Sequence, residues 1–347
     1  MNLNCTTWRT ASLAAIALLT APAVGCSERQ AAAPRSGEVV ERRLTAMGTS
    51  LHITVEAPER RAALLASEDA VRAIAAVEER LSTWTEDSEL ARDLERARHW
   101  WQETAGAFDP AVGPLVEAWD LRGAGRVPSA DVLDAALAAS GFEQFELDAD
   151  GLTRRHIACA LEEGAFGKGI GLDAAAEALR AAGISSATID LGGQVLRLGE
   201  EAGATISIAH PDDRMSPLCD LVLRGGSVAT SGNSERAIEI DGERYGHLLD
   251  PRTGQPAPDF GSVTVLAECG IDADCLATAL FVMGPEEALA FASHHDGIEV
   301  VVVESGSEEL RVRATPGLES DLTTRMEGLR LEFVEDAAPL DPTPPRK

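Results

Sequence analysis

The chain has 347 residues, which is enough to bury a sizeable hydrophobic core in one large or two average domains. Its formal net charge of −27 argues against nucleic-acid binding, because no basic patch could easily outweigh that charge. No stretch after residue 25 is long and apolar enough to span a bilayer.

The N-terminus has the pattern of an export signal. Arg9 precedes an apolar run, residues 11–24, and small residues lead directly to Cys26. This pattern is similar to a bacterial lipoprotein signal, in which Cys26 becomes the acylated first residue; an ordinary secretory signal cleaved nearby is the alternative. We therefore expect residues 1–25 to be a signal peptide and residues 26–40 a flexible tether. We expect the protein to be a membrane lipoprotein of the bacterial cell envelope that faces the periplasm.

Residues 41–334 predict one intertwined unit of mixed α+β architecture, because helices and strands alternate irregularly without a linker-like change in composition. The tail 335–347 is proline-rich and is expected to be disordered. In chain order the patterns predict a strand at 51–55 and a helix at 59–81. A second helix begins at 88, a short third one ends near 119, a fourth spans 129–140, and a fifth opens at 164–171 and runs to 182. There follow strands at 187–191, 204–209, 219–224, 227–231, 236–240 and 262–267, helices at 272–283 and 286–294, and a buried strand at 299–303.

Besides Cys26, the region after the signal holds four cysteines, which are Cys159, Cys219, Cys269 and Cys275. Their spacing lacks a paired C-x-x-C, which argues against structural zinc. We expect buried free thiols, with a single disulfide as the alternative.

Residues 247–254, with the sequence HLLDPRTG, concentrate polar chemistry at a predicted turn. His247 is a base or ligand, Asp250 an acid and Arg252 either an anion receptor or a brace for the turn. Gly254 is free to adopt a positive φ. A plain surface turn is the alternative reading.

Two further segments suit a phosphate and a metal ion. The glycine-rich turn 164–171 carries Lys168 at a predicted helix start, where exposed amides and a cation favour a phosphate; a solvated lysine at an ordinary helix start is the alternative. Asp274 and Thr278 are four residues apart and so share one helix face, where their oxygens suit Mg²⁺. Asp272 is a candidate helix cap.

Three segments suit contacts with an organic ligand. The run 227–236 is rich in small and hydroxyl residues, and it fits either a close ligand approach or a hairpin turn. Phe108 with Asp109 offers an apolar surface beside a carboxylate. Trp84 offers a flat surface for stacking on a planar ring, although a tryptophan is more often part of the core.

Taken in chain order, these segments resemble the FAD:protein FMN transferase (ApbE) family across residues 42–334. The fragments that carry the resemblance are 47–49, 81–84, 87–90, 108–110, 112–115, Trp119, Lys168–Gly169, Asp173, 192–193, 229–232, 247–254, 262–265, 273–274 and Thr278. The resemblance implies a Mg²⁺-dependent enzyme that splits FAD at its pyrophosphate. It moves FMN onto a threonine or serine hydroxyl of an acceptor protein and releases AMP.

The resemblance also assigns roles by position. Asp274, Thr278 and the backbone carbonyl of Gly167 would bind the metal ion, and Lys168 would hold phosphate. His247 would lie near the metal and the reacting phosphate, where its residue type suits a general base. The remaining FAD-site residues are Met47, Trp84, Ala107, Phe108, Asp109 and Thr230.

Some positions depart from the family pattern, and they put fine substrate contacts in doubt more than the metal site. Gly167 replaces a usual alanine, Gln194 stands where aspartate is common, and Ser234 stands where an aromatic residue often lies. Two other functions stay open. The same site fits a Mg²⁺-dependent FAD pyrophosphatase with water as acceptor, and a flavin-binding lipoprotein without catalysis needs no metal pair.

Overall fold

The computed structural model describes residues 37–83, 88–148, 151–199, 203–233, 237–240, 242–305 and 310–335. The signal peptide, Cys26, Trp84 and the tail from residue 336 therefore lie outside the described residues. The described residues from Gly37 onward form one compact unit. Its first strand begins at Glu38, so the folded region starts slightly before the expected residue 41.

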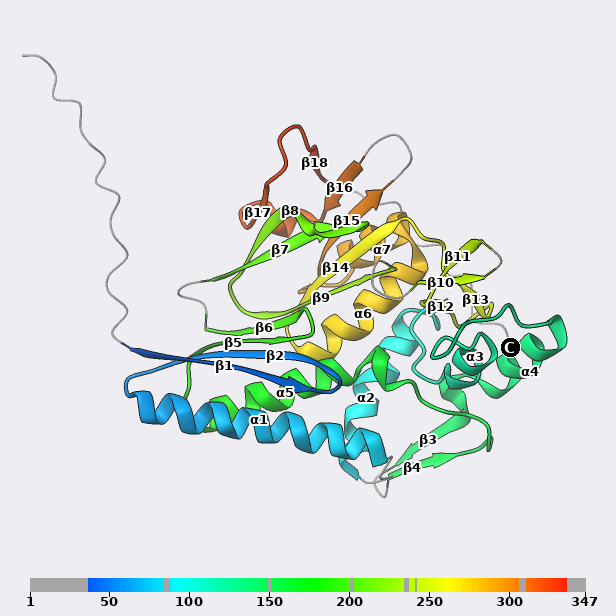
Figure 1. Ribbon diagram of the computed structural model, residues 1–347, viewed down its shortest axis with the longest axis horizontal. Coiled ribbons are helices and arrows are strands. Elements are labelled where there is room, and N and C mark those ends of the chain that lie inside the picture. Colours follow the sequence, from blue (N-terminus) through cyan, green and yellow to red (C-terminus); the bar gives the residue numbers. More distant parts are fainter. Residues whose placement is uncertain are drawn as a thin grey trace, which may run out of the picture. The chain divides into compact units, whose positions relative to one another are not determined.

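The described residues form a nine-stranded sheet in the order β1-β2-β5-β6-β9-β14-β15-β16-β18 (Figure 1). Every neighbouring pair is antiparallel except β16 and β18, which are parallel. The strands are β1 (Glu38–Ala46), β2 (Thr49–Ala57), β5 (Ser186–Leu191), β6 (Gln194–Leu198), β9 (Gly226–Gly232), β14 (Gly261–Ala267), β15 (Glu299–Ser305), β16 (Leu310–Ala314) and β18 (Leu331–Phe333).

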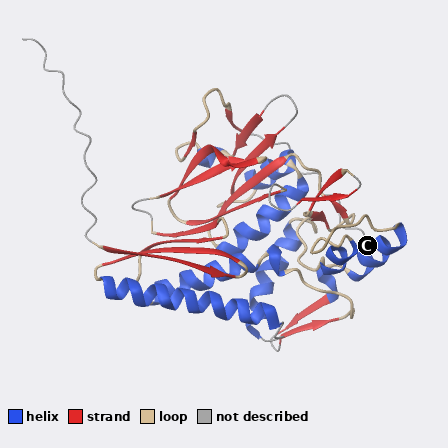
Figure 2. Ribbon diagram, viewed as in Figure 1, coloured by secondary structure: helices blue, strands red, loops and turns tan. Residues whose placement is uncertain are grey.

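Helices pack along one face of this sheet (Figure 2). Helix α1 (Arg60–Thr83) contacts β1 and β2, and α5 (Gly167–Ala181) contacts β5 and β6. Helix α6 (Gly270–Met283) contacts β9 and β14, with α2 (Ser88–Glu103) and α7 (Pro285–Ser293) packed against α6. Nearly every side chain of α6 is buried, because neighbours surround it on all sides.

The other face of the sheet carries a second hydrophobic cluster. It joins β9, β15 and β16 to a three-stranded sheet of β7 (Ala204–His210), β8 (Asp213–Leu223) and β17 (Leu322–Thr324). Smaller elements complete the unit. They are α3 (Gly113–Ala118), α4 (Ala130–Ala139) and the strand pairs β3 (Phe145–Asp148) with β4 (Gly151–Arg154), β10 (Ala237–Ile240) with β11 (Glu243–Gly246), and β12 (Leu249–Asp250) with β13 (Gln255–Pro256).

The mixed α/β class predicted from the sequence is confirmed, and the helices α1 to α7 lie where their patterns placed them. Several strands were not predicted, including β1, β6, β16 and β18. All four cysteines in the described region are free, as expected, and only Cys269 is partly exposed. Within that region no helix is long and apolar enough to cross a membrane.

Candidate functional site

Two tight hairpin turns meet at one end of the sheet. Met47 and Gly48 join β1 to β2 with φ values of 49° and 70°, and Gly192 and Gly193 join β5 to β6 with 61° and 89°. Positive φ at both central residues is the geometry that lets a two-residue turn follow the strand twist. The N–H of Gly192 donates to the carbonyl of Ser50 at 2.9 Å, which holds the turns side by side.

A cleft of about 580 Å³ opens beside these turns, a size typical of ligand sites. Pairing between β6 and β9 ends at Val195 and Val228, although β9 continues to Gly232. The cleft occupies the region beyond that last pair. It is lined by Met47, Gly48, Thr49, Gly164, Lys168, Asp190, residues 192–195, 205–211, Arg214, residues 229–232, His247, Leu248, Ser262 and Thr278.

Asp274 lies behind the cleft wall, where α5 and α6 meet. Its Oδ1 is 3.1 Å from Nζ of Lys168, and its Oδ2 accepts the backbone N–H of Gly169 at 2.9 Å. The helices approach this closely because Gly169 has no side chain: a Cβ there would lie 2.6 Å from the carbonyl oxygen of Gly270. Asp274 is 5% exposed, while Lys168 and Thr278 reach the cleft.

Two other carboxylates fix the start of α6. Asp173 on α5 accepts the backbone N–H groups of Gly270 and Ile271 at 2.6 and 2.9 Å, so this side chain caps the helix. Burial raises the pKa of Asp173 to about 6, against the opposing effect of these hydrogen bonds.

Asp272 has a different role from the expected cap. It accepts hydrogen bonds from Arg96, and from Nε1 of Trp100 at 2.6 Å, which tie α6 to α2. Burial alone would raise the pKa of Asp272, but the bonds from Arg96 and Trp100 hold it below its usual value. The expectation that Asp272 caps the helix was wrong, since Asp173 from another helix does so.

The loop 247–254 contributes His247 to the cleft lining, and its other end is a turn held by side-chain hydrogen bonds. The guanidinium of Arg252 donates to both oxygens of Asp250, at 2.8 and 3.0 Å. The N–H of Gly254 donates to the carbonyl of Asp250, and Gly254 has a φ of 69°. Arg252 therefore braces the turn, the second of the two roles considered for it.

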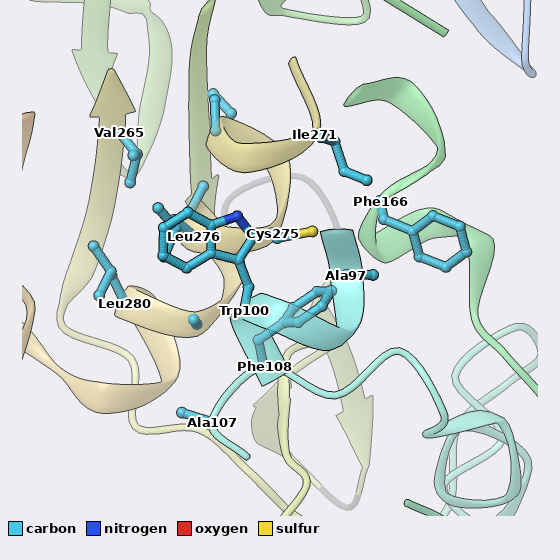
Figure 3. Packing of buried hydrophobic residues seen from close by; sticks show 14 of the residues in the cluster. Ala97, Trp100, Ala107, Phe108, Phe166, Val265, Ile271, Cys275, Leu276 and Leu280 are labelled. Atoms are coloured by element: carbon cyan, nitrogen blue, oxygen red, sulfur yellow. The ribbon is translucent and has the colours of Figure 1, made fainter. Parts of the chain in front are cut away.

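Three residues assigned to the FAD site from the resemblance are not among the residues that line this cleft. Ala107 and Phe108 are fully buried, and Figure 3 shows both within the core cluster that includes Trp100 and Leu280. Asp109 is 7% exposed, and its two oxygens accept the N–H groups of Ala111 and Phe142, at 2.7 and 3.0 Å. Burial raises its pKa to about 7 despite these bonds. In this structure the three side chains serve packing and loop geometry.

The other assigned residues converge. Met47, Lys168, Thr230, His247 and Thr278 line one cleft. Thr230 on β9 shares a 2.9 Å hydrogen bond with Thr264 on β14. Gly167 is the buried first residue of α5, next in the chain to Lys168. Their individual roles stay predictions.

Sequence reasoning missed the wall formed by β7 and β8. Thr205, Ser207, His210 and Arg214 line the cleft there. The β-branched residues at 204–209 predicted the strand, but nothing local indicated that it lines the cleft beside the glycine turns.

Among the described residues no three His, Cys, Asp or Glu side chains are grouped as a metal site. The assigned donors need no such group, because they comprise one carboxylate, one hydroxyl and one backbone carbonyl. Such a set, completed by water and phosphate oxygens, fits Mg²⁺. The buried Asp274 carboxylate beside Lys168 and Thr278 agrees with that chemistry.

Comparison with known proteins agrees with the geometry. The model of the ApbE family matches residues 47–302. The FAD:protein FMN transferase of Treponema pallidum is 34% identical over 255 residues, which are 67% of this chain and 69% of that protein. The protein of the same name from Rhodobacter capsulatus is 36% identical, over 73% of this chain and 47% of its own length.

A solved structure shows the same fold. The ApbE protein of Thermotoga maritima is 28% identical, with a TM-score of 0.70, and the match covers 77% of this chain and 94% of that one. Fold, cleft and family model point the same way: the chain belongs to the ApbE family.

Proposed function

We propose that this chain is an FAD:protein FMN transferase, which cleaves FAD and attaches FMN through a phosphoester to a threonine or serine of an acceptor protein. The observation that carries the proposal is one cleft that gathers Lys168, Thr278 and His247, with the Asp274 carboxylate directly behind Lys168. The ligand class follows from this set, because a cation, a hard oxygen site and a base suit transfer at a phosphate.

The chain's own groups account for most of the reaction. Lys168 neutralises phosphate charge, and Asp274 keeps the ammonium in place at 3.1 Å. His247 takes the proton from the acceptor hydroxyl as its oxygen attacks the phosphorus of the FMN half. The phosphoanhydride bond breaks, and the AMP phosphate leaves.

Asp274, Thr278 and the carbonyl of Gly167 would hold Mg²⁺. When bound there, the cation would neutralise charge that develops on the phosphate oxygens. A Cβ on Gly167 would lie 3.1 Å from Leu81 and 3.3 Å from Met47. The alanine usual in the family would thus fit here with small shifts. The missing methyl group leaves the backbone carbonyl oxygen of Gly167 available as a metal ligand.

The decisive experiment incubates the purified chain with FAD, Mg²⁺ and a candidate acceptor domain, followed by intact mass measurement and nucleotide analysis. Covalent FMN on the acceptor with release of one AMP per FMN supports the proposal. FMN and AMP without a modified acceptor indicate FAD hydrolysis instead. FAD that binds but stays intact with Mg²⁺ and every acceptor contradicts both activities.

We also propose that Cys26 carries the lipid anchor that places the enzyme at the periplasmic face of a membrane. The support is the sequence alone, a short apolar run ending in small residues before this cysteine. Expression with labelled palmitate tests it. Label on the wild-type chain but not on Cys26→Ala supports the anchor, and equal labelling of both excludes this site.

A further inference from the structure

Gln194 stands where β6 and β9 separate, and it belongs to the cleft wall. It is the first residue of β6, directly after the Gly192–Gly193 turn, and it lines the cleft although only 2% of it is exposed. A polar side chain this deeply buried needs hydrogen-bond partners for each of its atoms.

The amide nitrogen of Gln194 has its partners. Nε2 lies 2.7 Å from the carbonyl oxygen of Gly270 and 3.4 Å from Oγ of Ser227. A backbone carbonyl only accepts, so the nitrogen is identified without ambiguity. The Ser227 hydroxyl donates to the carbonyl of Val195 at 3.1 Å, which leaves its oxygen as the acceptor for Gln194. The amide is therefore locked in one orientation.

The amide oxygen has no such partner. Among the described residues nothing donates to Oε1 of Gln194, and the atom is shielded from bulk water. An acceptor left unsatisfied in this way costs folding free energy, and a donor supplied by a ligand would recover it. A residue of the cleft wall thus carries a buried acceptor that has no donor among the described residues.

We infer that Gln194 contacts the substrate, and that its side-chain carbonyl accepts a hydrogen bond from an N–H or O–H group of the bound flavin nucleotide. This inference rests on the proposed function. Both halves of FAD carry such donors: the ring imide and ribityl hydroxyls in the FMN half, the amino group and ribose hydroxyls in the AMP half. An amide accepts such a bond without adding negative charge to a cleft that must take a pyrophosphate.

The contact also links the substrate to α6, the helix that carries Asp274 and Thr278. Gly270, which holds Nε2, is the first residue of α6, and Asp274 and Thr278 follow on that helix. A side chain clamped to the start of α6 and bonded to the nucleotide fixes the substrate relative to both residues.

Calorimetric titration of the full chain with FAD, FMN and AMP tests the inference. Gln194→Met keeps the length and flexibility of the side chain but removes the acceptor. We expect the Kd for FAD to rise about 2- to 10-fold, the effect of one lost hydrogen bond. The loss should be confined to FMN or to AMP, which identifies the half that donates.

Ser67→Ala is the matched control, because it also removes a buried polar group but lies on α1, outside the cleft lining; its Kd values should stay within about twofold. Thermal melts check folding, and Gln194→Leu replaces Gln194→Met if the latter does not fold. Equal losses for FMN and AMP, or no loss for either, overturn the inference. If the wild-type chain binds none of the three ligands, the proposed function fails and takes this inference with it.

Discussion

The ammonium group of Lys168 lies 3.1 Å from Oδ1 of Asp274, in a contact that joins α5 to α6 across the back of the cleft. The N–H of Gly169 donates to the other oxygen, so each carboxylate oxygen has one contact from α5 and keeps a further lone pair for a cation. The negative charge that would bind a cation is thereby fixed in position and partly balanced by Lys168.

Asp274→Asn tests this arrangement. The variant keeps the shape of the side chain and loses its charge. FMN transfer should fall about 100-fold or more, because the cation that would neutralise charge in the transition state loses its carboxylate ligand. The affinity for FAD should change much less, because the flavin and adenine contacts are untouched. Transfer assays over a range of Mg²⁺ concentrations give both quantities. Asp259→Asn changes the same charge at an exposed loop position and should behave as wild type. Unchanged Mg²⁺-dependent transfer by Asp274→Asn would rule out the metal assignment.

His247→Asn separates proton transfer from substrate contact. If the imidazole accepts the proton of the attacking hydroxyl, the rate constant of transfer should fall about 100- to 1,000-fold, while the Kd for FAD stays within a few-fold. Single-turnover assays and titration of FAD measure the two effects separately. His156→Asn, at an exposed position on another loop, is the control. A raised Kd with an unchanged rate constant would mean that His247 only holds the substrate.

Local patterns predicted the elements that bear the site. The helices α5 and α6 and the glycine pair 192–193 could be predicted from short stretches of sequence, and the i,i+4 relation of Asp274 and Thr278 follows from helix geometry alone. The positive φ of Gly254 and the cysteines' lack of pairing were also accessible in this way.

Contacts between distant segments could not be predicted from local sequence patterns. Asp173 caps a helix that begins 97 positions later. The residues near the start of α6 therefore suggested Asp272 as the cap instead. Phe108 is buried in a cluster that joins distant segments, and Asp109 accepts a hydrogen bond from the N–H of Phe142, 33 positions away, which no local motif encodes. The departure at Gln194 was visible in the sequence, but its partner Gly270 is 76 positions away.

Asp109 should make stability depend on pH. Its pKa is about 7 in the folded chain because of burial, against an ordinary value of 3.8. Between those values the folded state holds a proton that the unfolded state has lost. The group therefore favours folding at low pH, and this contribution is lost as the pH rises from about 4 to 7.

Asp109→Asn removes this titration. From pH 5 to pH 8 the free energy of unfolding of the wild type should fall relative to that of the variant by about 1–3 kcal/mol. Urea unfolding at the two pH values measures the difference. Asp134→Asn, an exposed site on α4, should show no such change. Parallel pH curves for wild type and Asp109→Asn would mean that this carboxyl group titrates outside that window.

Gly254 ends the loop that carries His247, and both its conformation and its surroundings exclude a side chain. Its φ is 69°, and a Cβ there would lie 2.9 to 3.1 Å from methyl groups of Leu115, Leu133 and Leu137. Gly254→Ala should therefore lower the free energy of unfolding by about 2–3 kcal/mol, from backbone strain together with overpacking. Urea unfolding measures the loss, and the transfer assay shows whether the displaced loop also misplaces His247.

Gly242→Ala is the matched control for that substitution. Gly242 has a similar positive φ of 83°, but, apart from its chain neighbours, none of the residues that the structure describes has an atom within 4 Å of the position its Cβ would take. This variant should lose only about 1 kcal/mol, the cost of the left-handed conformation without a clash. The difference between the two variants isolates the packing of the loop against α3 and α4. Equal losses would show that strain alone explains the glycine at 254, and that the three leucines yield to an added methyl group.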